Sequence, residues 1–332
     1  MTTRGLLPSI SLCVLISLSG LRSDAAGEEF IRIASFNIAE FGEGDHPTTR
    51  DLSTISKMLV DNDLDLIAIQ EVGVAEQALR QVMRLKDAMN NRRSAAQPKY
   101  FAWVSPLSGD ERYAVIYRFP VVKGDEIWWL DDDKVPGNPR AGGTIYFRVP
   151  VAIPFSARNF DFVLVNMHLT WGNLERRSRE MAALRKFLAD DNDPEKDWIA
   201  VGDMNRYGKY SKSTADKGFD QLLSGSWKNV YRFPLLEAIT EPDDMQVFRA
   251  SVDGMSTTVA QSKNVYDQII ITQGAFREFG TTEPKLGTHV GIIAFDTQAP
   301  FNAISDHNEV KYRVSDHRPI WARFRIDLED DD

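Results

Sequence analysis

Hydrophobic and polar residues alternate in several short stretches of this chain, a period of two that is typical of β-strands with one buried face. The stretch from Phe30 to Ile38 follows this pattern. Two other stretches, Leu64–Glu71 and Phe160–His168, contain almost continuous apolar runs, which indicates strands that are buried on both faces. Further strands are predicted at 100–105, 113–118, 121–130, 144–150, 198–201, 265–271 and 320–324.

Apolar residues recur with the 3.6-residue spacing of amphipathic helices in three places. These places are 49–59, 74–89 and 174–188. A fourth helix is predicted at 216–223, inside the otherwise loop-rich segment 206–262. Residues 131–139 are predicted to form an exposed loop, and residues 281–306 to be irregular. Because no internal repeat or low-complexity linker divides the chain, we predict one domain over residues 27–332.

The first 26 residues have the features of an export signal. Arg4 provides a positive charge, residues 6–18 are mostly apolar, and small residues surround Ala25 and Ala26. The apolar run is too short and too interrupted for a comfortable membrane span. We therefore predict a signal peptide at 1–26, cleaved near Ala25 or Ala26, and a secreted or periplasmic protein. An uncleaved membrane anchor is the alternative.

Composition narrows the possible classes of protein. Hydrophobic residues make up 43% of the 332 residues, which is enough for a large core and excludes a disordered chain. The single cysteine, Cys13, lies in the predicted signal peptide, so disulfides, thiolate metal sites and cysteine nucleophiles are excluded from the mature protein. The net charge of -9 excludes a general polyanion binder. Contact with nucleic acid would need a local basic surface or divalent cations.

Polar side chains recur at the points where predicted strands end. Each has an ordinary structural explanation, because Asn and Asp often cap turns and a single His is usually structural. Five separate segments share the pattern, however, and this joint occurrence predicts a common site. The residues are Asn37, Glu71, His168, Asp203, Asn205, Asp316 and His317.

These side chains suit the hydrolysis of a phosphate ester. Carboxylate and amide oxygens without cysteine favour a hard cation, Mg²⁺ with Mn²⁺ or Ca²⁺ as alternatives, over tetrahedral zinc. The two histidines can divide the proton transfers, one activating water and the other protonating the leaving oxygen. Each imidazole needs a carboxylate to orient it, and Asp267 and Glu111 are available.

The order of these motifs resembles that of the endonuclease/exonuclease/phosphatase superfamily. The chain is most similar to the deoxyribonuclease I branch, through the segments Phe36–Gly42, Glu111–Arg118 and Phe147–Val151. The motifs that carry the superfamily resemblance are Ser35–Ile38, Ile69–Val72, Asn166–Leu169, Gly202–Asn205, Tyr266–Asp267 and Ser315–Pro319.

The resemblance implies an α+β fold, a four-layer α/β/β/α sandwich of two packed mixed sheets with the site at one edge. It implies that Asn37 and Glu71 hold a catalytic divalent ion. The residues implied to bind a second ion, or to position the attacking water and the phosphate, are Asp203, Asn205 and Asp316. The implied proton-handling pairs are His317 with Asp267 and His168 with Glu111, while Arg148 would contact a phosphate and Tyr113 would line the site.

The chain also departs from the deoxyribonuclease I pattern. Gly73 and Gly109 stand where that branch has an Arg and a Tyr that enter the DNA minor groove, and the disulfides of the branch are absent. A secreted, metal-dependent endonuclease acting on DNA is the leading hypothesis. The alternative substrate is a phospholipid head group, an inositol phosphate or another small phosphoester, with Trp128 and Trp129 as candidate lipid contacts. The complete set of site residues argues against an inactive binding protein, and no obligate protein partner is indicated.

Overall fold

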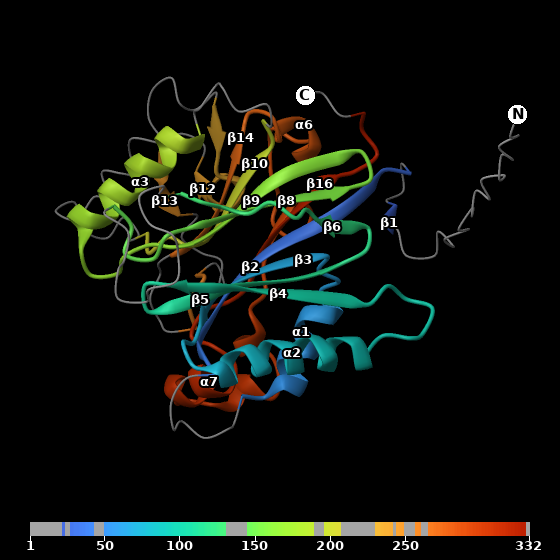
Figure 1. The fold of residues 1–332 in the computed structure, drawn as a ribbon, viewed down its shortest axis with the longest axis vertical. Helices are drawn as coiled ribbons and strands as arrows, with labels where there is room; N and C mark the ends of the chain where they lie inside the picture. The colour runs from blue at the N-terminus through green and yellow to red at the C-terminus, as the bar shows by residue number, and fades with distance from the viewer. Residues whose placement is uncertain are drawn as a thin grey trace, which may run out of the picture.

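Two β-sheets pack face to face between layers of helices (Figure 1). The computed structural model describes residues 22–23, 27–42, 50–130, 145–188, 196–206, 230–241, 244–248, 256–259 and 265–329. Among these residues, no helix has both the length and the hydrophobicity that a membrane span requires. The predicted α/β/β/α sandwich is confirmed.

The first sheet contains the N-terminal and C-terminal strands of the domain. Strands β2 and β3 are parallel, and the other pairs are antiparallel. The order is β15 (Val290–Ile292), β16 (Ile320–Arg325), β2 (Glu29–Phe41), β3 (Leu66–Val72), β5 (Glu111–Arg118) and β4 (Tyr100–Ser108), with β1 (Arg22–Ser23) beside β2.

The second sheet is formed by the middle of the chain. Strands β9 and β10 are parallel, and their neighbours are antiparallel to them. The order is β11 (Tyr231–Arg232), β14 (Asp267–Thr272), β10 (Trp198–Asp203), β9 (Phe160–His168), β8 (Val151–Ala157) and β6 (Val121–Lys123), with β7 (Trp128–Trp129) also beside β8. A separate ribbon pairs β12 (Thr240–Glu241) with β13 (Asp244–Phe248).

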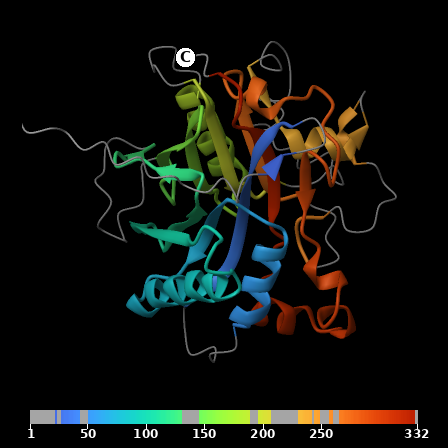
Figure 2. The same cartoon turned by 90° about the vertical axis from the view of Figure 1, so that its right-hand side faces the viewer.

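Helices cover the outer faces of both sheets. Figures 1 and 2 show α1 (Leu52–Asp61), α2 (Glu76–Asn91) and α7 (His307–Arg313) on one side of the first sheet. Helix α3 (Leu174–Leu188) lies beside the second sheet, where Phe187 packs edge-on against Trp198 with 4.9 Å between ring centroids. The shorter elements are α5 (Pro234–Ile239), α6 (Phe276–Phe279), η2 (Phe295–Thr297) and η3 (Phe301–Ala303).

The core has two parts that follow from the strand patterns. Side chains such as Ile33 and Leu164 fill the space between the sheets. The alternate residues of the first sheet's strands, such as Ala34 on β2 and Ile67 on β3, pack in the same cluster as buried residues of α1 and α2. Burial on both faces explains why the sequence of β3 is almost entirely apolar.

Several predicted elements differ from the structure. Residues 145–150 form no strand, and Pro150, which has no N–H to donate, precedes β8. The predicted strand 121–130 divides into β6 and β7, because these two segments pair with opposite ends of β8. The segment 281–306, predicted to be irregular, contains β15, η2 and η3. The predicted helix 216–223, the predicted loop 131–139 and most of the predicted signal peptide lie outside the described residues.

A buried amide pair connects the two sheets directly beneath the ends of the strands. Gln70 on β3 donates from Nε2 to Oδ1 of Asn166 on β9 at 2.7 Å, and Ser35 donates its hydroxyl to Gln70 Oε1 at 3.3 Å. Asn166 Nδ2 donates to backbone carbonyls on β3 and β5. Since all three side chains are fully buried, the network fixes how the sheets are aligned.

We expect the substitution Gln70→Leu to lower the free energy of unfolding by about 1–3 kcal/mol, because it leaves the buried Asn166 oxygen and the Ser35 hydroxyl without partners. Urea denaturation measures this change. The matched control is Gln77→Leu at an exposed position of α2, which should change stability little. Equal stability of the two variants would contradict a role for the amide pair.

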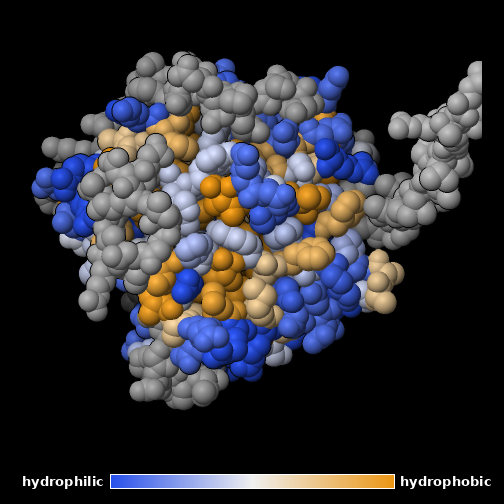
Figure 3. Space-filling model, viewed as in Figure 1, coloured by the Kyte–Doolittle hydropathy of each residue, from blue (hydrophilic) through white to orange (hydrophobic). Residues whose placement is uncertain are grey.

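Hydrophobic side chains also reach the surface at the edges of both sheets. On the face in Figure 3, hydrophobic colour gathers over β4 and β6, the edge strands of the two sheets. Phe101 on β4 is 57% exposed and Val122 on β6 is 53% exposed. Phe101 packs against the ring of Tyr117 on the neighbouring strand. It lies at the end of the β4–β5 pair that is remote from Glu111.

Candidate active site

Strand pairing brings the polar strand ends together. On the second sheet, Asp203 at the end of β10 is in register with His168 on β9 and with Asp267 on β14. On the first sheet, Asn37 is in register with Gln70, the residue before Glu71. Parallel pairing of β9 with β10 and of β2 with β3 directs these carboxyl ends to the same edge of the sandwich.

Gly202 permits this close approach. Its backbone has φ 150°, and a Cβ at this position would come within 1.8 Å of the carbonyl oxygen of Met167 on the adjacent strand. A residue with a side chain would therefore push β10 away from β9. The glycine allows Asp203 to lie directly beside His168.

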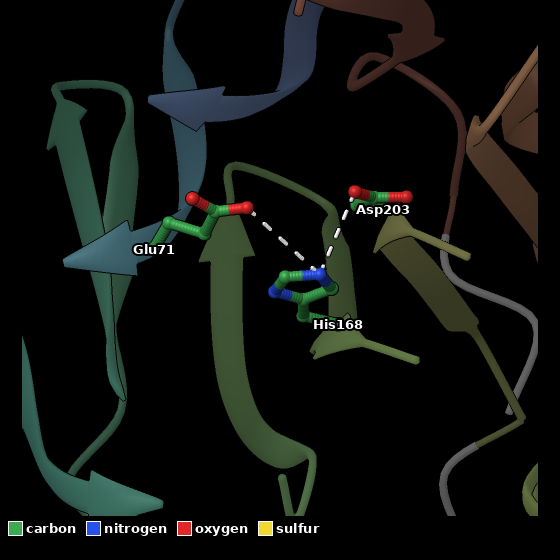
Figure 4. Close-up of side chains that lie close together, drawn as sticks. All are labelled: Glu71, His168 and Asp203. Atoms are coloured by element: carbon green, nitrogen blue, oxygen red, sulfur yellow. Dashed lines mark ion pairs between the residues drawn. The ribbon is translucent and has the colours of Figure 1, made fainter. Parts of the chain in front are cut away.

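Asp203 lies at the centre of the cluster. Its Oδ2 is 3.0 Å from Asn37 Nδ2, 3.5 Å from His168 Nε2 and 3.6 Å from His317 Nε2. Glu71 Oε1 accepts a hydrogen bond from Asn37 Nδ2 at 2.8 Å and is 4.0 Å from His168 Nε2. Figure 4 shows the imidazole of His168 between the carboxylates of Glu71 and Asp203.

Each histidine is oriented by a buried carboxylate. His168 Nδ1 is 2.9 Å from Glu111 Oε2, and His317 Nδ1 is 2.8 Å from Asp267 Oδ2. These are the two pairings that the resemblance to the superfamily implies. Because each Nδ1 is engaged, both Nε2 atoms face Asp203. The two imidazoles, one at the end of β9 and the other in the segment before β16, therefore present the same ring atom to one point.

The electrostatics of the cluster favour protonated histidines next to ionised acids. Burial lowers the pKa of His168, but Glu111 and Asp203 outweigh burial and raise the pKa to about 9. Burial likewise opposes the charge on His317, yet Asp267 and Asp203 raise its pKa well above its ordinary value. For Asp203 and Glu71, burial acts to raise the carboxyl pKa. The attraction of the two imidazoles is the stronger effect, so both carboxyl pKa values lie below their usual range.

This charge arrangement predicts how stability depends on pH in the presence of a chelator. Because the pKa of His168 is raised, its protonation contributes fully to the free energy of unfolding below pH 6.5. We expect this stabilisation to be lost as the pH rises through about 9. The loss should be on the order of 3 kcal/mol. Urea denaturation in EDTA at several pH values measures it. The free energy of unfolding of the variant His168→Gln should decrease less over the same pH range. An equal decrease in the variant and the wild type would contradict the raised pKa of His168.

The cluster has the donor atoms for a divalent cation. Two groups of side chains, Glu71 with His168 and Asp203, and Asp203 with Asp267 and His317, each place their ligand atoms within 4.8 Å of one another. Carboxylate oxygens suit Mg²⁺, Mn²⁺ or Ca²⁺. In the structure, Nδ2 of Asn37 donates hydrogen bonds to Glu71 and Asp203, while Oδ1 of Asn37 accepts from the backbone N–H of Ala39. Its amide would have to turn to present an oxygen to a cation.

The side chains of two predicted metal ligands have other partners in the structure. Asn205 donates from Nδ2 to the carbonyl of Leu169, and its backbone N–H donates to Asp203 Oδ1. Asp316 has a side chain that is 39% exposed and is 3.4 Å from Lys311 Nζ. A second ion or a positioned water at these residues therefore stays a prediction.

Arg148 and Tyr113 support the His168 side of the site. Arg148 Nε is 2.9 Å from Glu111 Oε2 and 2.7 Å from Asp110 Oδ1, so its guanidinium is held by two carboxylates. Tyr113 is fully buried, and its hydroxyl accepts from the His168 backbone N–H and donates to the Arg148 carbonyl. Tyr113 thus joins the two segments from inside the protein.

Sequence reasoning missed two cations beside the site. Arg50 donates from Nη1 to the carbonyls of Lys311 and Val314 and from Nη2 to that of Ala39, so it connects the end of β2 with the segment before His317. Lys311 lies between Asp316 and Glu40, at 3.4 Å from each. Neither residue lies at a strand end, so the pattern that identified the acids carried no signal for them.

Comparison with known proteins identifies the family. Residues 34–317 match the model of the endonuclease/exonuclease/phosphatase family. The chain belongs to the endonuclease/exonuclease/phosphatase family. As a member of this family it is a phosphoesterase, and the matched segment contains every residue of the cluster from Asn37 to His317.

Individual members of the endonuclease/exonuclease/phosphatase family are similar over most of the chain. Deoxyribonuclease-1 of Oryctolagus cuniculus is 25% identical over 321 residues, which cover 94% of this chain and 95% of the rabbit protein. A family protein from Bacteroides thetaiotaomicron has a similar structure, with a TM-score of 0.54 and 14% identity over 90% of this chain and 98% of that chain. A mannosyl-6-phosphatase from the same organism has a TM-score of 0.50 and 14% identity over 89% of this chain and 98% of that chain.

Proposed function

We propose that this phosphoesterase is a divalent-metal-dependent endonuclease that hydrolyses the phosphodiester bonds of DNA. The observation that carries the proposal is the convergence of His168 Nε2 and His317 Nε2 on Asp203 Oδ2, at 3.5 and 3.6 Å. Two imidazoles with the same orientation on either side of an anionic centre suit a reaction that removes one proton and delivers another.

In the proposed reaction, the oxygen of a water molecule forms a bond to phosphorus while the bond from phosphorus to the leaving sugar oxygen breaks. One imidazole, in its neutral form, accepts the proton of the water, and the other, as an imidazolium, donates a proton to the leaving oxygen. The neutral form of the first ring would be favoured where a cation reduces the negative charge of Asp203, which raises the pKa of both histidines. Glu111 and Asp267 keep Nε2 of each ring directed at the reacting atoms. A cation held by Glu71 and Asp203 would supply neutralisation of the phosphate charge.

DNA is the substrate that the similarity to rabbit deoxyribonuclease-1 supports, because that similarity extends over nearly the full length of both chains. The alternative is a small phosphoester or a lipid head group. It is favoured by Gly73 and Gly109, which lack the side chains that enter the minor groove in deoxyribonuclease I. We also propose that the protein is exported through the signal peptide at 1–26, so that the mature chain begins near Gly27.

The test is incubation of the chain from Gly27 onward with supercoiled plasmid in Mg²⁺, Mn²⁺ or Ca²⁺. Nicking that is lost both in EDTA and in the His317→Ala variant supports the endonuclease. A parallel assay uses bis(p-nitrophenyl) phosphate, sphingomyelin and phosphoinositides. Hydrolysis of one of these without any plasmid nicking would contradict the DNA assignment and select the alternative. Mass spectrometry of protein recovered outside the cytoplasm measures the mature N-terminus.

A further inference from the structure

Trp171 is an exposed aromatic residue immediately beside the candidate active site. It follows His168 by three residues, in the loop between β9 and α3, and 68% of its surface is exposed. No ring contact involves Trp171 in the described part of the chain. Tryptophan usually buries most of its large apolar surface. The ring of Trp171 is thus a large apolar surface open to solvent on the loop that follows His168.

Glu180 fixes this loop relative to the Arg148 loop, residues 145–150. The carboxylate of Glu180, buried on α3, accepts from the Thr170 backbone N–H at 2.9 Å and from the Thr170 hydroxyl at 2.7 Å. The same carboxylate accepts from the Phe147 backbone N–H at 3.1 Å. One buried group therefore holds the residue before Trp171 and the residue before Arg148 side by side.

Arginines surround the aromatic ring of Phe147 on this side of the site. The guanidinium carbon of Arg148 is 5.2 Å from the ring centroid of Phe147, and that of Arg176 is 5.4 Å from it. Arg179, one helical turn after Arg176, is exposed. Alternation of aromatic rings with arginines is characteristic of surfaces that bind the bases and phosphates of single nucleic-acid strands.

Helix α3 is also locally basic in an acidic protein. The chain has a net charge of -9, whereas α3 carries five basic and two acidic residues. Arg177 and Glu180 are buried, so Arg176, Arg179, Arg185 and Lys186 determine the charge that solvent meets, with Glu175 as the exposed acid. This is the local basic surface that an acidic protein needs in order to bind a polyanion.

We infer that Phe147, Trp171, Arg176 and Arg179 form a nucleotide-binding rim, in which Trp171 stacks on a base next to the scissile phosphate and the arginines contact the adjoining backbone. The inference rests on the proposed endonuclease function. It assigns contact with bases to the α3 side of the site, whereas Gly73 and Gly109 provide no side chain for such contact.

The test compares two oligonucleotides of equal length, one with normal bases and one with abasic positions flanking the cleavage site. The wild-type protein should cut the normal oligonucleotide faster, and Trp171→Ala should lower kcat/KM for this substrate by about 10- to 100-fold. The same substitution should change kcat/KM for the abasic oligonucleotide little. Trp171→Phe, which keeps an aromatic ring, should retain most of the preference for bases.

Phe101→Ala is the matched control, because Phe101 is also an exposed aromatic residue but lies at the remote end of β4. It should leave both rates unchanged. Equal cleavage of both substrates by Trp171→Ala and wild type would overturn the rim while the endonuclease stands. Failure of the wild-type protein to cut either oligonucleotide, with bis(p-nitrophenyl) phosphate still hydrolysed, would overturn the endonuclease and the rim together.

Discussion

Asp203→Asn is expected to slow phosphodiester cleavage by at least about a thousandfold. The carboxylate is in contact with Asn37 and lies within 3.6 Å of Nε2 of both imidazoles, and it belongs to both groups of candidate cation ligands. The substitution keeps the shape of the side chain but removes its charge. Cation affinity should therefore fall together with the rate of cleavage, whereas Glu111 and Asp267 still orient the two histidines.

Plasmid nicking and isothermal titration with Mn²⁺ measure these two effects. The matched control is Asp161→Asn, because Asp161 is exposed near the start of β9, at the opposite end of the strand from His168. The control should nick plasmid and bind Mn²⁺ as the wild-type protein does. Activity of Asp203→Asn within tenfold of wild type, with normal Mn²⁺ affinity, would rule out Asp203 as the centre of the site.

The second large effect is expected at the histidines. His168→Ala and His317→Ala should each lower kcat by about 10²- to 10⁴-fold, because each removes one proton-transfer group. The double variant should be less impaired than the product of the single effects, because the two groups act in the same transition state.

Single-turnover cleavage of plasmid measures these rates without a contribution from product release. His307→Ala is the control, since His307 is exposed at the start of α7 and lies outside the cluster. It should cut at the wild-type rate. A multiplicative effect in the double variant would indicate that the two imidazoles contribute independently to the transition state and do not act as a unit.

Much of the site could be predicted because its residues occupy strand ends. An apolar run that stops at Glu71 or His168 identifies both the strand and the polar group that leaves the core. Asp203 and Asn205 follow in the same way after Gly202, whose missing side chain is needed for contact with Met167. The histidine–carboxylate pairs were expected from the resemblance, and the structure shows both.

The parts that could not be predicted depend on contacts between distant segments. Arg50 and Ala39 are near in sequence, but the carbonyl of Val314 that Arg50 also binds comes from the other end of the chain. In the sequence, Gln70 is not distinguished from the other residues of its strand. Only the packing of the second sheet places Asn166 within hydrogen-bond distance of it. The residues 145–150 have strand-like composition, yet none of the described strands pairs with them.

By itself the sequence determined most of the strands and helices, the residues at the ends of the strands and the class of chemistry, because hydrophobic period and side-chain type are local properties. The layered fold was implied by the resemblance to the superfamily, which the ordered motifs carry. Only the tertiary structure decided that Asp203 is the centre, that Asp316 faces Lys311 at the margin, and that Trp171 stands beside the Arg148 loop. These facts depend on strand register and on single buried groups such as Glu180, which join segments that the linear order keeps apart.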